Sequence, residues 1–223
     1  MAQPDVVHEP KWRRLPEERP RQILDAAFEV FAEHGLASAR LDDIARRAGV
    51  SKGTIYLYFP SKEDLFREVV RHTVGDAIDD IERRIAGATA MDDLNAFMDA
   101  KWRFLCSPKF PPLQRWVHGE LTAYPELAEF YGQEVLGRGR ALLRSILERG
   151  MERGEFRRMD SGVAARALVA LLVTYGNWRH KPVLCESMDG KTDTQLLDEI
   201  KQFYLSAIRP LPDAPHAQAT PLS

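Results

Sequence analysis

Hydrophobic positions along this chain recur with the period of an α-helix, and no stretch of useful length alternates as a β-strand would. The first apolar stripe contains Ile23, Ala27 and Phe31, and Gly35 follows it as a C-terminal stop. The same period continues to residue 208. It predicts helices over residues 21–34, 41–48, 52–59, 62–85, 91–105, 112–123, 125–153, 161–179 and 192–208. We therefore expect an all-α protein.

Proline and glycine positions divide this pattern. Pro60 ends the third helix, and Ser61 can cap the next one with Asp64 three residues later. Pro108, Pro111-Pro112 and Pro125 mark further breaks, as does the segment 186–193. Residues 1–20 and 209–223 are rich in Pro, Ala or charge, and such segments bury too little apolar surface to become ordered. The predicted organisation is an arm over 1–20, a head over 21–62, a helical domain over 63–208 and a tail over 209–223.

Composition places the chain among ordinary globular proteins, because 44% of its 223 residues are hydrophobic and 29% are charged. The formal net charge of −2 does not by itself indicate a nucleic-acid partner, so any DNA contact must come from locally placed cations. Cys106 and Cys185 have no metal-ligand spacing and are expected to be free thiols. No secretory signal and no bilayer-spanning run is visible, which predicts a cytoplasmic protein with no membrane contact.

The most informative segment is residues 41–59, LDDIARRAGVSKGTIYLYF, which we interpret as two short helices around a tight turn. Ala45 is small enough for the second helix to cross close to it, and Gly49 suits the left-handed conformation of a sharp turn. Ser51 is placed to cap the second helix. The positions expected to form the small core are Ile44, Ala48, Val50, Ile55 and Tyr58.

The second helix of this unit presents groups that suit DNA. In helix-turn-helix proteins its N-terminal end enters the major groove. Lys52 can donate to guanine, Thr54 can contact a base or a thymine methyl, and Gly53 permits close approach of the backbone. Hydroxyls such as those of Tyr56 and Tyr58 suit phosphates. Lys62, at the start of the next helix, is a further candidate phosphate contact.

Residues 21–70, and above all GVSKGTIYLYFPSKEDLF, resemble the N-terminal domain of the tetracycline-repressor (TetR) family. The resemblance implies a three-helix DNA-binding head whose contacts are Ser51, Lys52, Gly53, Thr54, Tyr56, Tyr58 and Lys62. Arg40 matches a backbone-contact position where Thr or Ser is commoner, and Arg21 could add another phosphate contact. The resemblance also implies a helical C-terminal domain with a ligand cavity, and a homodimer. Residues 116–149 are similar to a C-terminal subtype of the family.

Two helices of the second domain are candidates for self-association. The helix over 161–179 could form a close seam with Ala164, Ala167, Ala170 and Leu171. The helix over 192–208 offers Leu196, Leu197, Ile200, Phe203 and Tyr204. Paired with their copies across a two-fold axis they would form a four-helix bundle, and the alternative is that both belong to the core of one chain.

Candidate effector contacts are aromatic or polar residues of the second domain, although most aromatic residues of any domain are ordinary core. They are Trp102, Trp116, His118, Glu120, Tyr124, Tyr131, Tyr175 and Trp178. His118 and Glu120 are two residues apart and point in different directions on a helix, so no metal site is expected.

No catalytic motif and no cofactor motif is present in the sequence. We therefore interpret the chain as a homodimeric repressor, not an enzyme, that a small, largely apolar or aromatic effector releases from a palindromic DNA operator. The alternatives are an activator with the same fold, and a DNA-bound interaction protein that needs no effector.

Overall fold

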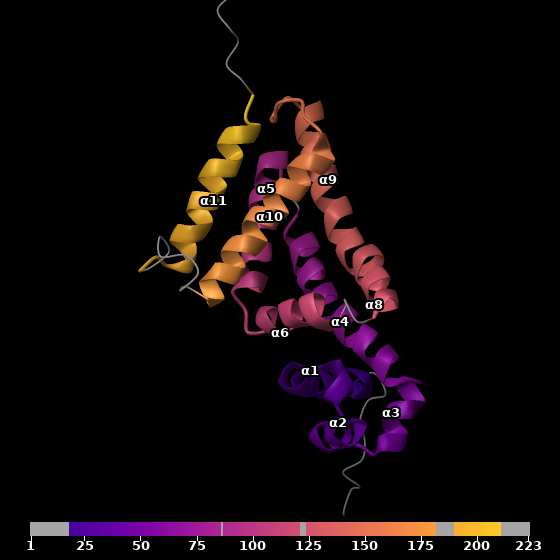
Figure 1. The fold of residues 1–223 in the computed structure, drawn as a ribbon. Coiled ribbons are helices and arrows are strands. Elements are labelled where there is room, and N and C mark those ends of the chain that lie inside the picture. Colours follow the sequence, from indigo (N-terminus) through magenta and orange to yellow (C-terminus); the bar gives the residue numbers. More distant parts are fainter. Residues whose placement is uncertain (1–17, 86, 121–123, 182–189, 211–223) are drawn as a thin grey trace, which may run out of the picture. The chain divides into compact units, whose positions relative to one another are not determined.

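A computed structural model describes residues 18–85, 87–120, 124–181 and 190–210, without the side chains of Glu120, Glu134 and Val135. The described residues are helical with no strand, which confirms the all-α prediction (Figure 1). The elements are α1 (Glu18–Ser38), α2 (Leu41–Ala48), α3 (Lys52–Tyr58), α4 (Lys62–Arg84), α5 (Ala90–Leu105), α6 (Phe110–Arg115), η1 (Trp116–Glu120), α8 (Pro125–Phe130), η2 (Tyr131–Val135), α9 (Leu136–Glu152), α10 (Ser161–His180) and α11 (Asp193–Ile208). Most of the predicted arm and tail, and Cys185, lie outside the described residues.

The chain forms two compact units that divide within α4, after His72, whereas the sequence predicts a boundary after Lys62. The first turns of α4 belong to the N-terminal unit because their apolar side chains complete its core. Leu65 and Phe66 are 0% and 1% exposed. The ring of Phe66 lies edge-on to that of Phe31, with centroids 5.3 Å apart.

In the N-terminal unit, α1 begins at Glu18, before the predicted start at residue 21. The predicted stop at Gly35 is confirmed by its positive φ of 73°, which interrupts the helical backbone. The predicted cap at Ser61 is also confirmed, since its Oγ accepts a hydrogen bond of 3.0 Å from the backbone N–H of Asp64.

The C-terminal unit is built around α5, which packs against α9, α10 and α11. In Figure 1, α10 lies between α9 and α11. Leu94, Leu147 and Leu168 represent its core, and each is fully buried. Thr192 is the N-cap of α11 and forms a capping box with Gln195. The Thr192 hydroxyl accepts a hydrogen bond from the Gln195 N–H, and the Gln195 side chain accepts one from the Thr192 N–H.

For two helices of the C-terminal unit, the predicted start or the predicted regular α-helical geometry was wrong. The helix predicted from residue 112 begins at Phe110, because Pro111 and Pro112 lie in its first turn, where a missing N–H breaks no hydrogen bond. It then changes to a π-helix over Trp116–Glu120. The helix predicted over 125–153 also contains a π-helical segment, Tyr131–Val135. A regular 3.6-residue pattern cannot reveal such segments, which are frequent at functional sites.

Candidate nucleic-acid interface and ligand-binding unit

The turn between α2 and α3 has the geometry that its sequence predicts. Gly49 adopts φ 65° and ψ 34°, a left-handed conformation that glycine takes without steric cost. The N–H of Val50 then returns to the carbonyl of Ala45 at 3.0 Å, and the N–H of Gly49 to that of Arg46 at 3.3 Å. These bonds satisfy carbonyls at the end of α2 and fix the direction in which α3 leaves.

Of the residues predicted to form the small core of this unit, Ile44 and Ile55 are buried, and Ala48 and Val50 are partly buried. Ile44 and Ile55 are 0% and 1% exposed, and Ala45 is 6% exposed. The prediction that Tyr58 completes this core was wrong, because its side chain is 40% exposed. Phe59, one residue later and in extended backbone, is only 6% exposed. The α3 helix ends at Tyr58, so the chain turns and directs the next side chain inward.

One face of α3 is exposed and carries most of the predicted DNA contacts. Ser51, Lys52, Gly53, Tyr56 and Tyr58 are all exposed. Sequence reasoning missed Leu57, which is 83% exposed between the two tyrosines. The sequence did contain a clue to Leu57, because an apolar residue stands within the helix that was predicted to face DNA. An apolar group there can contact a thymine methyl.

Ser51 and Thr54 hold the start of α3 together. The Ser51 hydroxyl accepts a hydrogen bond of 3.0 Å from the Thr54 backbone N–H, which makes Ser51 the N-cap. The two side-chain hydroxyls also hydrogen-bond to each other at 2.8 Å. Thr54 is partly buried, and because a hydroxyl can both donate and accept, it can keep this partner while it bonds to a base.

The predicted cations differ in their local partners. Arg40 is exposed and extended at the start of α2, and its side chain makes no hydrogen bond or ion pair with another described residue. Lys52 lies 3.1 Å from an Asp42 carboxylate oxygen in an exposed pair, which contributes little stability and can be exchanged for a phosphate. Lys62 donates to the carbonyls of Ala37 at 3.0 Å and Ala39 at 3.3 Å. Lys62 therefore links the start of α4 to the chain around the end of α1, and this structural role is additional to any phosphate contact.

A bidentate ion pair links α2 to α1. Arg47 donates to both carboxylate oxygens of Glu33, at 2.8 and 3.1 Å. The hydrogen bond from Arg47 lowers the pKa of Glu33 from its ordinary value. The pair thereby fixes the first helix of the DNA-binding pair on the longer α1.

In the C-terminal unit, four of the aromatic candidates are packed into the core or against it. Trp102 and Trp116 are 4% and 3% exposed. The indole N–H of Trp102 donates to the Asp193 carbonyl at 2.9 Å, which ties α5 to the start of α11. Tyr175 and Trp178 pack against the core with ring centroids 5.5 Å apart.

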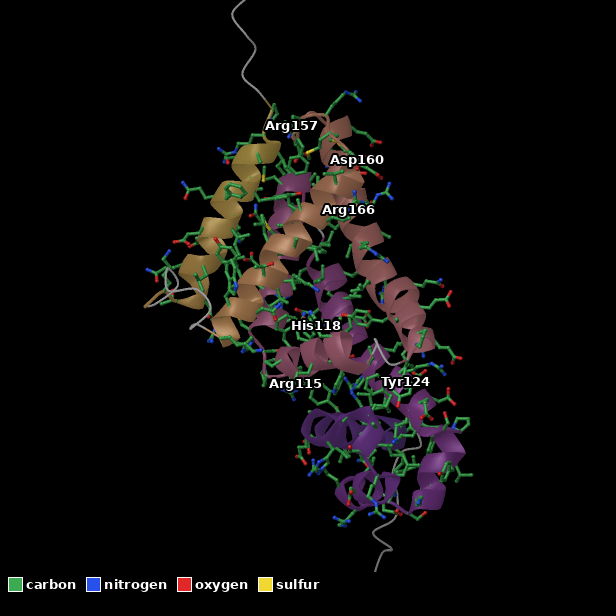
Figure 2. All side chains as sticks on the ribbon, viewed as in Figure 1. Arg115, His118, Tyr124, Arg157, Asp160 and Arg166 are labelled. Carbon is green, nitrogen blue, oxygen red and sulfur yellow. The ribbon has the colours of Figure 1, made fainter. Side chains whose placement is uncertain are left out.

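The remaining candidates lie on or beside the π-helical segments. His118 is exposed on η1, and its Nδ1 lies 2.8 Å from the Gln114 carbonyl. Figure 2 shows His118 and Arg115 on this stretch of chain and Tyr124 just before α8. Tyr124 and Tyr131 are partly buried, and burial raises the pKa of Tyr131 to about 12. The side chain of Glu120 lies outside the described residues.

Among the recesses on the described surface of the C-terminal unit, two each include one of the described sequence-predicted candidates. The first has a volume of about 740 Å³, and its lining includes Trp102, Cys106 and charged residues of α5 and α11. The second, which we call the basic recess, has a volume of about 380 Å³. It is lined by Phe110, Pro111, Gln114, Arg115, His118, Asn177, His180 and Lys181.

Sequence reasoning also missed Lys101, which lies on the inward face of α5. Its spacing in the sequence was the clue, because Lys101 follows Phe97 by four residues and precedes Leu105 by four, which puts the three on one face of a helix.

Within the described part of the chain no three His, Cys, Asp or Glu side chains are grouped as metal ligands. No helix there has the length and apolar composition needed to cross a bilayer.

The α2–turn–α3 geometry and its exposed polar face define a helix-turn-helix DNA-binding protein. The family model for bacterial regulatory proteins of the tetR family matches residues 23–69. The model for the C-terminal domain of AefR-like transcriptional repressors matches residues 92–207. The chain belongs to the TetR family and is a transcriptional regulator with a DNA-binding head and a C-terminal ligand-binding domain.

Individual relatives agree with this assignment. The chain is 30% identical over 195 residues to the transcriptional repressor SCO4008 of Streptomyces coelicolor, covering 85% of this chain and 94% of that one. The fatty acid metabolism regulator protein of Bacillus subtilis is 42% identical over 83 residues, which cover 36% of this chain and 43% of the relative. The crystal structure of FadR from Bacillus subtilis in complex with stearoyl-CoA has a TM-score of 0.71 at 27% identity, covering 85% of this chain and 99% of that one.

Proposed function

We propose that this chain is a homodimeric repressor that binds a palindromic operator through α3 and leaves it when a small effector binds the C-terminal unit. The observation that carries the DNA-binding part is the exposed face of α3, where Lys52, Gly53 and Tyr56 surround the helix N-terminus. A capped helix N-terminus with exposed donors suits the phosphate backbone and the major groove.

Exposed apolar side chains on α10 and α11 support the dimer. Val163 on α10 is 55% exposed and Phe203 on α11 is 65% exposed, although each lies on a helix whose opposite face is buried. Ala167 and Ala170 are exposed beside them on α10. The rest of the predicted set is different. Leu171 is partly buried, and Ala164, Leu196, Leu197, Ile200 and Tyr204 are buried in the core of this chain. The interface we propose is therefore centred on Val163, Ala167, Ala170 and Phe203.

The effector would act through the spacing of the two heads. Recognition helices of such a dimer enter successive major grooves about 34–36 Å apart. The α4 helix begins in the head and ends in the C-terminal unit. An effector that binds better when this spacing is wrong shifts the dimer away from the operator-binding state. By linkage the operator must then weaken effector binding by the same factor.

The DNA contacts are tested by fluorescence anisotropy on labelled DNA from upstream of the gene, with scrambled DNA as competitor at two salt concentrations. Arg40→Ala and Lys52→Ala are expected to weaken binding and to lower the salt dependence, because each removes a cation from the proposed DNA-facing surface. Arg83→Ala is the control, since this 69% exposed side chain lies on α4 within the C-terminal unit. Equal binding of specific and scrambled DNA by the wild type would contradict the proposal.

The dimer is tested separately by sedimentation velocity. Phe203→Glu places a charge on the proposed interface and is expected to shift the protein toward monomer, whereas Ser145→Glu on the exposed face of α9 should leave the dimer unchanged. A wild type that sediments as a monomer at micromolar concentration would refute the proposed interface.

A further inference from the structure

Lys101 lies at the centre of the most buried face of α5, where a hydrophobic side chain is expected. Ala90, Leu94, Phe97, Met98 and Leu105 flank it on the helix surface at spacings of three, four, seven and eleven residues. None of these five is more than 2% exposed. A cation at such a position costs free energy unless a partner compensates it.

No described residue supplies that partner. The ammonium makes no hydrogen bond or ion pair within the described chain, and its recorded neighbour is the Phe104 ring, whose centroid lies 5.7 Å from Nζ. Two carboxylates on the same helix are paired with other cations. Asp93 pairs with Arg149, and Asp99 lies 2.6 Å from Lys201. The cation–π contact with Phe104 compensates only part of the cost of desolvating an ammonium.

Lys101 nevertheless keeps part of its surface accessible, unlike the apolar residues that flank it. Burial lowers its pKa to about 8, so it remains largely protonated at neutral pH. An ammonium that lies among apolar side chains, stays charged and remains partly accessible to solvent can bind an anion that enters the unit from solvent.

The basic recess points independently to the same kind of ligand. Its ionisable lining residues are Arg115, His118, His180 and Lys181, and none of the lining residues that the structure describes is a carboxylate. One of its lining residues, Phe110, packs against Phe104, the ring beside the Lys101 ammonium, with ring centroids 6.3 Å apart. Cationic side chains such as that of Lys181 in the lining of a recess attract ligands of the opposite charge.

We propose that the C-terminal unit takes an organic anion with an apolar body, and that the Lys101 ammonium binds its acid group while the partly buried Phe104 ring beside it contacts the body. This proposal rests on the proposed effector-binding role of the unit and specifies the chemistry of the effector. A carboxylate, sulfonate or phosphate on an aliphatic or aromatic skeleton has that chemistry. A cationic effector is excluded from this position, since it would place two positive charges together without a counter-ion.

The test compares two fluorescent dyes that share a skeleton and differ in charge. The probes are 1-anilinonaphthalene-8-sulfonate, which is anionic, and N-phenyl-1-naphthylamine, which lacks the sulfonate. Each is titrated without DNA into the full-length wild type, Lys101→Met, Lys101→Arg and the control Lys191→Met, in which an exposed lysine paired with Glu199 is replaced. Far-UV circular dichroism and thermal unfolding verify that each variant is folded.

We expect Lys101→Met to weaken binding of the sulfonate dye about ten-fold or more, the loss typical of a charge-assisted hydrogen bond. Binding of the neutral dye should be unchanged, and Lys101→Arg and Lys191→Met should retain the sulfonate dye. Unchanged sulfonate binding by Lys101→Met, equal losses for both dyes, or a wild type that binds neither dye would each overturn the proposal. Operator binding is measured separately, so a failure of the repressor hypothesis is distinguishable from a failure of the anion site.

Discussion

Gly150 lies in the last turn of α9, and replacing it with alanine has two opposing effects on stability: a gain in helix propensity and a clash with Phe156. In an ordinary helix interior, alanine is more stable than glycine by up to about 1 kcal/mol because it restricts the unfolded backbone. At Gly150, however, an added Cβ would lie 2.1 Å from Cδ2 and 2.2 Å from Cε2 of Phe156. Real Cβ contacts are essentially never that short, so either the ring or the helix must move.

Movement of Phe156 is expensive because the ring is only 2% exposed and the backbone on either side of it is tied down. The N–H groups of Glu155 and Phe156 both donate to the Gly150 carbonyl, at 2.8 and 3.1 Å. Overpacking a filled core costs about 1–3 kcal/mol. A contact this short belongs at the upper end of that range, and the gain in helix propensity offsets about one third of it. We therefore expect Gly150→Ala to lower the free energy of unfolding by about 2 kcal/mol.

The assay is urea unfolding followed by circular dichroism at fixed protein concentration, because the proposed dimerisation would make apparent stability depend on concentration. Gly139→Ala is the control on the same helix, since its added Cβ would meet only the end of the Ile78 side chain, at 3.9 Å. This control should be neutral or up to about 1 kcal/mol more stable. If Gly150→Ala is as stable as Gly139→Ala, the inferred clash between α9 and Phe156 is wrong.

Three further predictions concern local hydrogen bonds. Ser51→Ala removes the N-cap of α3 and should lower the unfolding free energy by about 1 kcal/mol while weakening operator binding; unchanged urea midpoint and anisotropy would contradict the cap. Tyr204→Phe removes the hydroxyl that donates to the buried Ala164 carbonyl at 2.9 Å, and urea unfolding should show a loss of about 1–3 kcal/mol. Glu33 has a folded-state pKa below its ordinary 4.5, so its stabilisation is present above that pH and is lost as the pH falls through the folded value. Glu33→Gln should therefore flatten the dependence of the urea midpoint on pH below about pH 5, and a variant with the wild-type slope would refute the pairing with Arg47.

The helix-turn-helix was predictable because its determinants are local. A left-handed Gly49, a capping Ser51 and an inward Ile44 each follow from backbone conformation or from a spacing of a few residues. The assignment of Tyr58 to the core failed where the helix ends, since helical spacing no longer applies once the chain turns at Phe59.

The ligand-binding unit was less predictable because its side chains are positioned by distant segments. Trp102 was a candidate contact by residue type, but its indole is occupied by the carbonyl of Asp193, 91 residues later. The π-helical segments at Trp116 and Tyr131 rotate the side chains that follow them, which a regular period cannot anticipate.

The sequence by itself determined the all-α class, the helix-turn-helix and the family, because period, caps and turn residues act over short distances. Only the tertiary structure decided which residues are buried, since burial depends on the helices that pack against a face. It placed Lys101 inside the apolar face of α5, committed Lys62 to the carbonyls of Ala37 and Ala39, and left Phe203 exposed while Tyr204 joined the core. These differences arise because each side chain's environment is set by neighbours far away in the chain.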